Sequence, residues 1–226
     1  MDGHPGTTLA DRAAQVVGDD ILSGRLQAGS RLHIRHLAER TGIGPTPLRE
    51  GLSRLLARGL VVAVEQRGFR VAAMSRADLE DILATRAALE TEALRLSIAN
   101  GDDRWEAGIV GALHRLVRFL ERAPRDARAV AQELDEVHKN FHTSLIAACG
   151  SVRILNLHSV LHDQGYRYRH KLVASFDPLA IAEEHRTLAG IVLERDADAA
   201  VEAYRDHLQI LVDGAFPDAD RHVTDT

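Results

Sequence analysis

Hydrophobic positions recur at helical spacing over much of this chain. Between residues 9 and 22 they fall three or four apart, which predicts a helix. Two shorter helices are expected over 34–42 and 45–59, and Pro45 suits a first helical turn because the N–H it lacks is unpaired there. Residues 60–73 contain two β-branched runs around a glycine, a pattern that predicts a hairpin. Three short helices followed by a hairpin are typical of a winged helix-turn-helix.

Beyond Ala73 the pattern of hydrophobic positions changes, and no later segment has the alternation that predicts a strand. Helical stretches separated by Gly, Pro, Asn or Asp are expected at 78–99, 103–122, 127–148, 151–174, 178–195 and 197–214. The expected fold is therefore mainly α, with an N-terminal winged helix-turn-helix and a C-terminal bundle of about six helices. The domain boundaries that we expect are a tail at 1–8, the winged helix at 9–73, a linker at 74–77, an all-α domain at 78–216 and a tail at 217–226.

Composition limits the setting in which this protein works. The chain has 226 residues, and its single cysteine, Cys149, excludes an intramolecular disulfide and fits a reducing cytosol. The N-terminus lacks the apolar segment of a signal peptide, and no apolar run approaches the roughly 20 residues that span a bilayer. We therefore expect a soluble cytoplasmic protein with no membrane partner.

The net charge of −5 is unevenly distributed. Up to Ala73 there are 10 Arg and no Lys against 7 Asp and Glu, and the rest of the chain has 18 Lys and Arg against 26 Asp and Glu. The first part is thus weakly basic and the remainder acidic. A basic part suits contact with a polyanion, although a balance this small is weak evidence.

Residues 138–142, HKNFH, place two histidines on the same helical face. The Cβ atoms of residues i and i+4 lie about 6 Å apart, so His138 and His142 can bind one metal ion. A zinc protease would need Glu beside the first histidine as a general base, and Lys139 stands there. The protease interpretation is therefore excluded, and no Ser-His-Asp pattern or phosphate-binding glycine loop appears elsewhere.

Two sets of partner histidines suit this pair equally well by spacing. His185 and His207 lie eleven residues before and after Asp196, so in an antiparallel hairpin they stand at one height. His158 and His162 are placed in the same way about Gly150, opposite His142 and His138. Spacing alone does not choose between the two sets.

Longer motifs carry a family resemblance over roughly residues 9–214. The stretch SGRLQAGSRLHIRHLAERTGIGPTPLREGLSRLLARGLV, with RGFRV after it, resembles the DNA-binding domain of the GntR superfamily of bacterial regulators. The motifs TRAALETEA, FHTSLIAACGS, EEHRTLAGIV and YRDHLQ resemble the all-helical ligand-sensing (FCD) domain of its FadR subgroup. Within that subgroup, EQRGFRVAAMSRADL, DRWEA and FHTSLIAACGS are most similar to the glutarate-responsive carbon-starvation regulators.

The expected DNA-binding residues lie in the first 73 residues. A recognition helix needs hydrogen-bond donors near its N-terminus, and a backbone contact is expected from the helix before it. A wing tip needs a residue that permits close approach to a groove. From the residues and the resemblance together, the DNA-binding candidates are Arg35, Thr46, Arg49, Arg54, Arg67 and Gly68.

Pro45 departs from the family pattern. The family usually has an arginine there that reads a guanine, and such a bidentate contact is worth about 1–3 kcal/mol of discrimination. We therefore expect an operator that differs from the usual family sequence.

The resemblance also chooses among the histidines. It places the metal ligands of the family on His138, His142, His185 and His207. The first ligand is usually Asp, so His138 makes this site less anionic. Such a site favours borderline ions, Zn²⁺ first and Ni²⁺ second, over Mn²⁺.

The resemblance places Arg86 in an effector pocket. Arg86 and Glu90 also share a helical face, so an intrahelical ion pair is the alternative interpretation. Further along, YRYRHK (166–171) offers Tyr166, Arg167 and Arg169 for the far carboxylate of a diacid, or else a solvated helix end. The effector implied by the resemblance is a small carboxylic acid, preferably a dicarboxylate such as glutarate.

The sequence therefore predicts a homodimeric transcriptional regulator, not an enzyme. Two winged helices would read a palindromic double-stranded operator, and the expected sign of regulation is repression. One alternative is a metal-dependent hydrolase with an appended DNA-binding domain, for which no general base is found. The other is an architectural DNA-binding protein without an effector.

Overall fold

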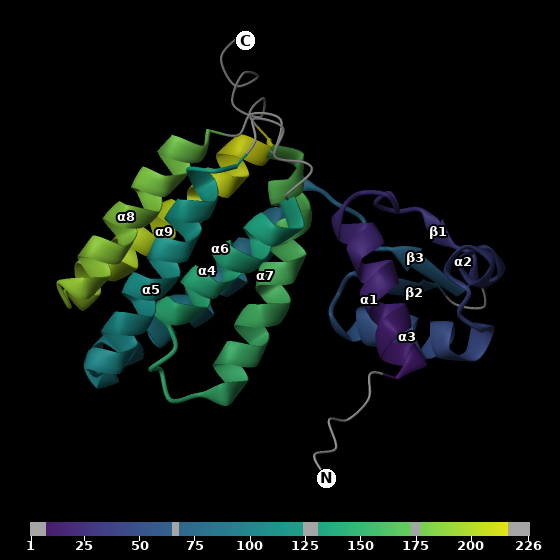
Figure 1. Cartoon of the computed structure of the whole chain (residues 1–226), viewed down its shortest axis with the longest axis horizontal. Coiled ribbons are helices and arrows are strands. Elements are labelled where there is room, and N and C mark those ends of the chain that lie inside the picture. Colours follow the sequence, from purple (N-terminus) through teal and green to yellow (C-terminus); the bar gives the residue numbers. More distant parts are fainter. Residues whose placement is uncertain (1–7, 65–67, 124–130, 173–176, 217–226) are drawn as a thin grey trace, which may run out of the picture. The chain divides into compact units, whose positions relative to one another are not determined.

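The computed structural model describes residues 8–64, 68–123, 131–172 and 177–216. The chain forms two compact units, Met1–Met74 and Ser75–Thr226, and each is described by itself. Figure 1 shows the course of the chain through both units. The fold class expected from the sequence is confirmed, because helices dominate and a small sheet accompanies the N-terminal helices.

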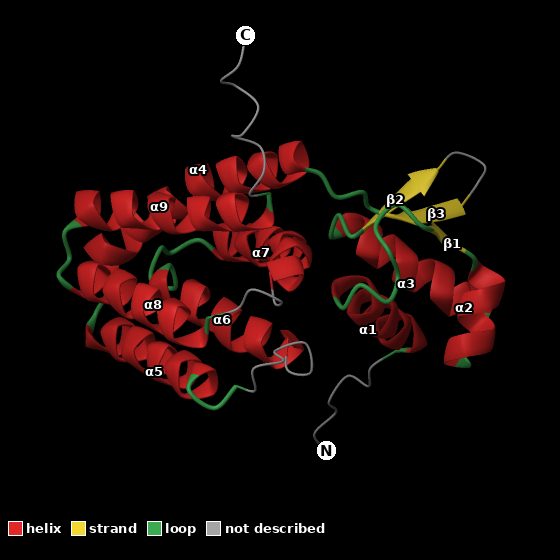
Figure 2. Ribbon diagram, turned by 90° about the horizontal axis from the view of Figure 1, so that it is seen from above, coloured by secondary structure: helices red, strands yellow, loops and turns green. Residues whose placement is uncertain are grey.

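In its described residues, the first unit combines helices with a small sheet (Figure 2). The elements are α1 (Leu9–Leu22), β1 (Arg31–Leu32), α2 (Ile34–Thr41), α3 (Pro45–Ala57), β2 (Val61–Val64) and β3 (Gly68–Val71). The sheet has the order β1-β3-β2 and is antiparallel throughout. The hairpin β2–β3 was expected and β1 was not, because a strand of two residues is too short to show alternation.

Helices α1 and α3 pack closely because Gly51 lies between them. A Cβ at Gly51 would come within 2.8 Å of both the Cβ of Ala13 and the amide nitrogen of Ala14. The start of α1 is fixed by a capping box in which Thr8 and Asp11 each bond the other's backbone N–H. The buried face of α1 then joins the leucines of α3 in a single apolar core.

The turn before α3 sets the direction of that helix. Gly42 ends α2 in the left-handed conformation, with φ of 69°, which glycine adopts without the steric cost of a Cβ. Gly44 is the N-cap of α3 and Pro45 occupies its first turn. The sequence thus presents the first two turns of α3 to solvent, with Thr46 and Arg49 exposed.

The second unit is a helical bundle in the described residues. Its helices are α4 (Arg76–Asn100), α5 (Asp103–Leu120), α6 (Ala131–Leu145), α7 (Val152–Leu172), α8 (Pro178–Leu193) and α9 (Ala197–Ala215). Helix α4 packs on α7 and α9, α5 packs on α6 and α8, and α8 packs on α9 (Figures 1 and 2). Side chains at the N-caps accept backbone N–H bonds at Ser75, Asp102, Asp177 and Asp196.

Helix α6 is shorter than the sequence predicts. The expected range was 127–148, of which 127–130 lie outside the described residues, and α6 ends at Leu145. Beyond it, backbone bonds from Ile146 and Cys149 span three residues, which is a turn geometry rather than an α-helix. Gly150, with φ of 74°, then reverses the chain into α7.

Helix α4 is unusual because polar side chains interrupt its buried face. Arg86, Glu90, Thr91 and Ser97 are all buried there among apolar residues. Buried charges need partners, so this part of α4 indicates a site rather than simple packing. None of the described helices is long and apolar enough to cross a membrane.

Candidate metal centre and nucleic-acid interface

Four histidines from three helices converge inside the second unit. Helix α6 supplies His138 and His142, α8 supplies His185 and α9 supplies His207, and one ring nitrogen of each lies within 4.8 Å of the others. The Nε2 atom of His142 is 3.2 Å from that of His138 and 3.1 Å from that of His207. Nitrogen ligands of a tetrahedral Zn²⁺ lie about 3.3 Å apart, given Zn–N bonds near 2.0–2.1 Å. The cluster therefore has the spacing of a metal site.

Two of these rings are oriented by hydrogen bonds on their outer side. Nδ1 of His207 bonds the carboxylate of Glu184, and Nδ1 of His185 donates to the carbonyl oxygen of Ile181 at 2.7 Å. Both rings then present the Nε2 lone pair to the cluster, as metal-binding histidines do. Among the described residues, the buried Nε2 of His185 has no hydrogen-bond partner, which fits a position that a metal would take.

The cluster favours uncharged imidazoles. Burial lowers the pKa of His138 and His142 well below the ordinary value, and neighbouring cationic groups lower it further. Burial also lowers the pKa of His185 to about 4. Neutral rings are the form that binds a metal ion, so the electrostatics agree with the geometry.

The rival histidines of α7 have other partners. Nδ1 of His158 lies 2.8 Å from Glu90 Oε1 and its Nε2 lies 3.2 Å from Thr143 Oγ1, so both of its nitrogens are engaged. Nε2 of His162 lies 3.3 Å from Nδ1 of His138, on the side facing away from the cluster. Asp135, His138 and His162 form a second, smaller group with metal-like spacing. His138 is thus shared by both groups.

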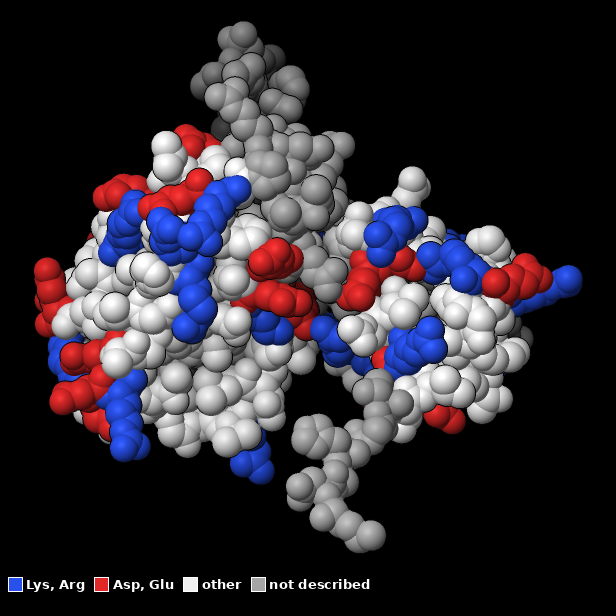
Figure 3. Space-filling model, viewed as in Figure 1, with Lys and Arg blue, Asp and Glu red and all other residues white. Residues whose placement is uncertain are grey.

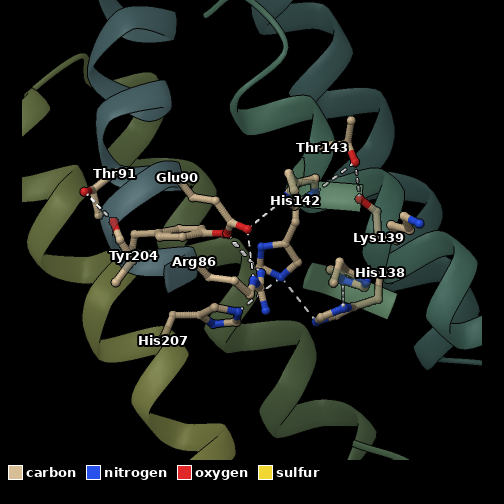
Figure 4. A network of polar contacts seen from close by, with 12 residues as sticks. Arg86, Glu90, Thr91, His138, Lys139, His142, Thr143, Tyr204 and His207 are labelled. Atoms are coloured by element: carbon tan, nitrogen blue, oxygen red, sulfur yellow. Dashed lines mark hydrogen bonds and ion pairs between the residues drawn. The ribbon is translucent and has the colours of Figure 1, made fainter. Parts of the chain in front are cut away.

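Arg86 is buried next to the histidines and is held by Glu90 (Figure 4). The guanidinium donates to the two carboxylate oxygens at 2.9 and 3.1 Å and to the Tyr204 hydroxyl at 3.4 Å. Burial alone would raise the pKa of Glu90, but Arg86 and His158 outweigh it and lower the pKa to about 2. The intrahelical ion pair weighed from the sequence is present, and it fixes Arg86 beside the cluster.

Arg169 approaches the same region from α7. Its Nη2 atom lies 2.6 Å from Asp135 Oδ1 and 3.1 Å from His162 Nδ1. Its Nη1 atom and that of Arg86 both reach towards Gly165, because a Cβ there would lie 3.3 and 3.9 Å from them. Two guanidinium groups thus converge on the bare face of a helical glycine, beside the histidines.

The other two effector candidates, Tyr166 and Arg167, are placed differently from these two guanidinium groups. The ring of Tyr166 is buried beneath the Arg169 guanidinium, and Cζ of Arg169 lies 5.9 Å from the centroid of that ring. Arg167 points instead towards Asp78 at the start of α4, at 3.8 Å. The structure therefore brings Arg86 and Arg169 together and places Arg167 elsewhere.

The sequence interpretation did not single out two residues that complete this site, and it named Glu90 only as an ion-pair partner of Arg86. Glu184 orients His207, Gly165 leaves room between two arginines, and Glu90 holds His158 as well as Arg86. A glycine inside a long helical pattern was the signal for Gly165, since helices avoid glycine. The acidic residue directly before His185 was the signal for Glu184.

The nucleic-acid candidates lie on the first unit. Thr46 and Arg49 are exposed on α3, and Arg35 is exposed on α2, where it pairs with Glu39 at 3.0 Å. Arg54 forms an ion pair with Asp11 of α1, so it is engaged inside the unit. Gly68 starts β3 with φ of 86°. Arg67, the other wing candidate, lies outside the described residues.

Charge on the visible surface is mixed. In Figure 3 the basic and acidic side chains intermingle on the face shown of each unit, without a large area of one sign. The face shown therefore offers no broad basic surface to a polyanion.

Comparisons with known proteins decide the family. The model of the family described as "Bacterial regulatory proteins, gntR family" matches residues 9–71, and that of the FCD domain matches residues 81–210. This chain belongs to the GntR family. As a GntR-family chain with an FCD domain, it is a transcriptional regulator and not an enzyme, so the hydrolase alternative is set aside.

Curated relatives and a solved structure agree with this placement in the GntR family. The chain is 41% identical over 204 residues to the "Uncharacterized HTH-type transcriptional regulator BphR" of Paraburkholderia xenovorans (strain LB400), covering 89% of this chain and 83% of the relative. It is 38% identical over 195 residues to the "HTH-type transcriptional repressor GlaR" of Escherichia coli (strain K12), covering 84% and 88%. The structure of E. coli McbR/YncC has the same fold, with a TM-score of 0.74 at 20% identity over 93% of this chain and 98% of that one.

Proposed function

We propose that this GntR-family regulator holds a divalent metal ion on His138, His142, His185 and His207 and binds a small carboxylate there. The effector would control how tightly the protein binds its operator. The observation that carries the proposal is the convergence of four imidazole nitrogens at the spacing of metal ligands. An all-nitrogen ligand set suits Zn²⁺ first and Ni²⁺ second.

The surroundings of the histidines support a carboxylate as the effector. With four histidines bound, the metal ion would take an anionic oxygen as a fifth ligand, and Arg86 and Arg169 add two cations that reach towards Gly165. A diacid suits this arrangement, with one carboxylate at the metal and the other at a guanidinium. Glutarate is the diacid that the sequence resemblance favours.

The DNA-binding end of the proposal uses Arg35, Thr46, Arg49 and Gly68. Two copies of the chain would read the two halves of a palindrome, since two-fold symmetry in the protein is matched by the operator. Repression is the proposed sign of regulation, supported by the relative GlaR, which is named a repressor. Effector binding changes the operator affinity by no more than its own difference in affinity for the two states.

A zinc titration combined with thermal unfolding tests the proposal. Wild-type protein is expected to bind one zinc ion per chain, and His142→Ala to lose it, whereas His114→Ala keeps it because His114 is an exposed residue of α5. In a set of mono- and dicarboxylic acids, at least one should raise the melting temperature of zinc-loaded protein. A ligand at a hundred times its Kd adds about 2.7 kcal/mol of stability, which is a shift of several degrees.

Two results would count against the proposal. If no acid raises the melting temperature of metal-replete protein, the bundle has no carboxylate effector and the architectural alternative gains support. If acids act equally after chelation, the metal is not part of the effector site.

A further inference from the structure

The outer side of His138 differs from that of the other histidines in the cluster. His207 and His185 have oxygen acceptors there, Glu184 and the carbonyl of Ile181, and in the described residues Nδ1 of His142 has no hydrogen-bond partner. His138 has another imidazole instead, because its Nδ1 lies 3.3 Å from Nε2 of His162. The family resemblance places Asp at this position. An ionised aspartate only accepts hydrogen bonds, whereas a neutral imidazole can carry its proton on either of two ring nitrogens.

The chain of contacts from Arg169 to the cluster has a direction. Arg169 Nη2 donates to Asp135 and lies 3.1 Å from Nδ1 and 3.2 Å from the carbonyl oxygen of His162. A guanidinium only donates, so an Nη2–H shared between these two atoms of His162 needs Nδ1 as an acceptor. The neutral ring of His162 then carries its proton on Nε2 and donates it to Nδ1 of His138. His138 in turn carries its proton on Nε2, the atom that faces His142 at 3.2 Å.

Metal binding requires the opposite arrangement. To bind a metal ion, Nε2 of His138 must offer its lone pair, so the ring carries its proton on Nδ1. That proton points at Nε2 of His162, which must now accept, and His162 carries its own proton on Nδ1. Two donors, His162 Nδ1–H and Arg169 Nη2–H, would then face each other at 3.1 Å.

Resting on the proposed metal centre, we propose that His162 couples that centre to Arg169 through paired tautomers of His138 and His162. A metal ion on His138 releases Arg169 from the His162 ring without any change in the number of protons bound to the two imidazoles, and the carbonyl oxygen of His162, 3.2 Å from Nη2, remains as an acceptor. The released guanidinium keeps Asp135, 2.6 Å away, and is freed to bind an anionic oxygen over Gly165. His162 is therefore a positioning residue. Arg169 favours one tautomer of His162 and the metal ion favours the other, until a carboxylate binds the guanidinium of Arg169.

A double-mutant cycle on zinc affinity tests this coupling. Zinc binding is measured by competition with a chelator for wild type, Arg169→Gln, His162→Leu and the double variant. Glutamine at 169 removes a cation and offers an amide oxygen that can accept from His162 Nδ1–H. The lost positive charge tightens zinc binding in both backgrounds. The repulsion between the two donors, His162 Nδ1–H and Arg169 Nη2–H, is removed only where His162 is present.

We expect Arg169→Gln to tighten zinc binding about tenfold more in the His162 background than in the His162→Leu background, within the range of coupling between contacting groups. His162→Leu alone should weaken zinc binding, and His162→Gln should restore most of it, since the amide oxygen accepts from His138 Nδ1–H. Equal effects of Arg169→Gln in the two backgrounds would overturn the coupling. A wild-type chain that fails to bind zinc would instead contradict the proposed metal centre itself.

The tautomers can also be observed in the wild-type chain, which does not depend on the variants folding. Nitrogen-15 spectra of histidine-labelled protein distinguish a ring protonated on Nδ1 from one protonated on Nε2, and a His162→Gln sample assigns the His162 signals. Zinc should move the His162 proton from Nε2 to Nδ1. Unchanged nitrogen shifts of His162 on zinc loading would refute the proposal.

Discussion

At the scale of single residues, the absence of a side chain at Gly165 shapes the site. Gly165 sits inside α7, where glycine costs helix stability relative to alanine. Its bare face leaves room for the Nη1 atoms of Arg86 and Arg169, which would lie 3.9 and 3.3 Å from a Cβ. The glycine is best explained by the room that it leaves for the two guanidinium groups, which are the cations of the proposed effector site.

Replacing Gly165 by alanine should therefore separate stability from binding. We expect Gly165→Ala to weaken binding of the acid effector about tenfold, while thermal stability stays the same or rises, since alanine gains about 0.5–1 kcal/mol in a helix. Gly108→Ala is the matched control, because a Cβ at this helical glycine of α5 meets nothing within 4 Å. Calorimetric titration gives the affinities, and equal acid affinities in the two variants would contradict this role.

The buried histidines make the metal-free protein sensitive to acid. Burial lowers the pKa of His185 from 6.5 to about 4, so between these pH values the unfolded chain binds a proton that the folded chain does not. Stability is therefore full above this window and is lost as the pH falls through it. For His185 alone the loss is on the order of 3 kcal/mol.

Urea unfolding of chelated protein measures this effect. The free energy of unfolding should fall between about pH 7 and about pH 5, and His185→Gln should flatten the slope. An unfolding free energy that does not change over this range would show that His185 is charged or exposed in the folded chain.

At the scale of elements, α3 carries the DNA prediction. Arg49 is exposed in its second turn, whereas Arg54 is tied to Asp11. Arg49→Ala should weaken operator binding by about 1–3 kcal/mol, the value of one bidentate base contact. Arg54→Ala is the paired control and should change operator binding much less. Fluorescence anisotropy at fixed salt measures both, and a larger loss for Arg54→Ala would reverse the assignment.

Helix α7 links the effector site to the start of α4. It carries His162, Gly165 and Arg169, and its Tyr168 hydroxyl donates to Asp78 and accepts from the backbone N–H of Ser75 at 3.1 Å. Ser75 is the first residue after the N-terminal unit. A movement of α7 on ligand binding would thus be passed to the residues that join the two units.

Tyr168→Phe should uncouple the two functions. The variant lacks the hydroxyl that bonds Ser75 and Asp78, and it should bind zinc and acid like wild type. The effect of the acid on operator affinity should shrink several-fold, within typical allosteric coupling of about 1–3 kcal/mol. Comparing operator binding with and without acid checks this, and an undiminished acid effect would show that α7 is not the link.

At the scale of the whole molecule, the sequence predicted the helices well because their periodicity and caps are local. The helical pattern of α4 to α9 and the hairpin β2–β3 were read correctly in type. The strand β1 was missed because two residues carry no period, and the end of α6 was placed too far along.

The site was predictable in part, for physical reasons. Equal distances about a turn identify histidines at one height, but they gave two candidate sets, and the family resemblance was needed to choose. The structure shows that His138 contacts His142 and His162 through opposite ring nitrogens, whereas His158 bonds Glu90 and Thr143 instead. Helix rotation and side-chain direction decide such contacts, and spacing along the chain does not contain them.

The proposed function requires a carboxylate to act on operator binding through the metal centre. The most direct test is operator binding by zinc-loaded protein, chelated protein and the His142→Ala variant, each with and without the acid that best stabilises the protein. Acid is expected to change the operator affinity of zinc-loaded wild type by about 5–150-fold and to leave the other two samples unchanged. An equal acid effect in all three samples, or none in zinc-loaded wild type, would contradict it.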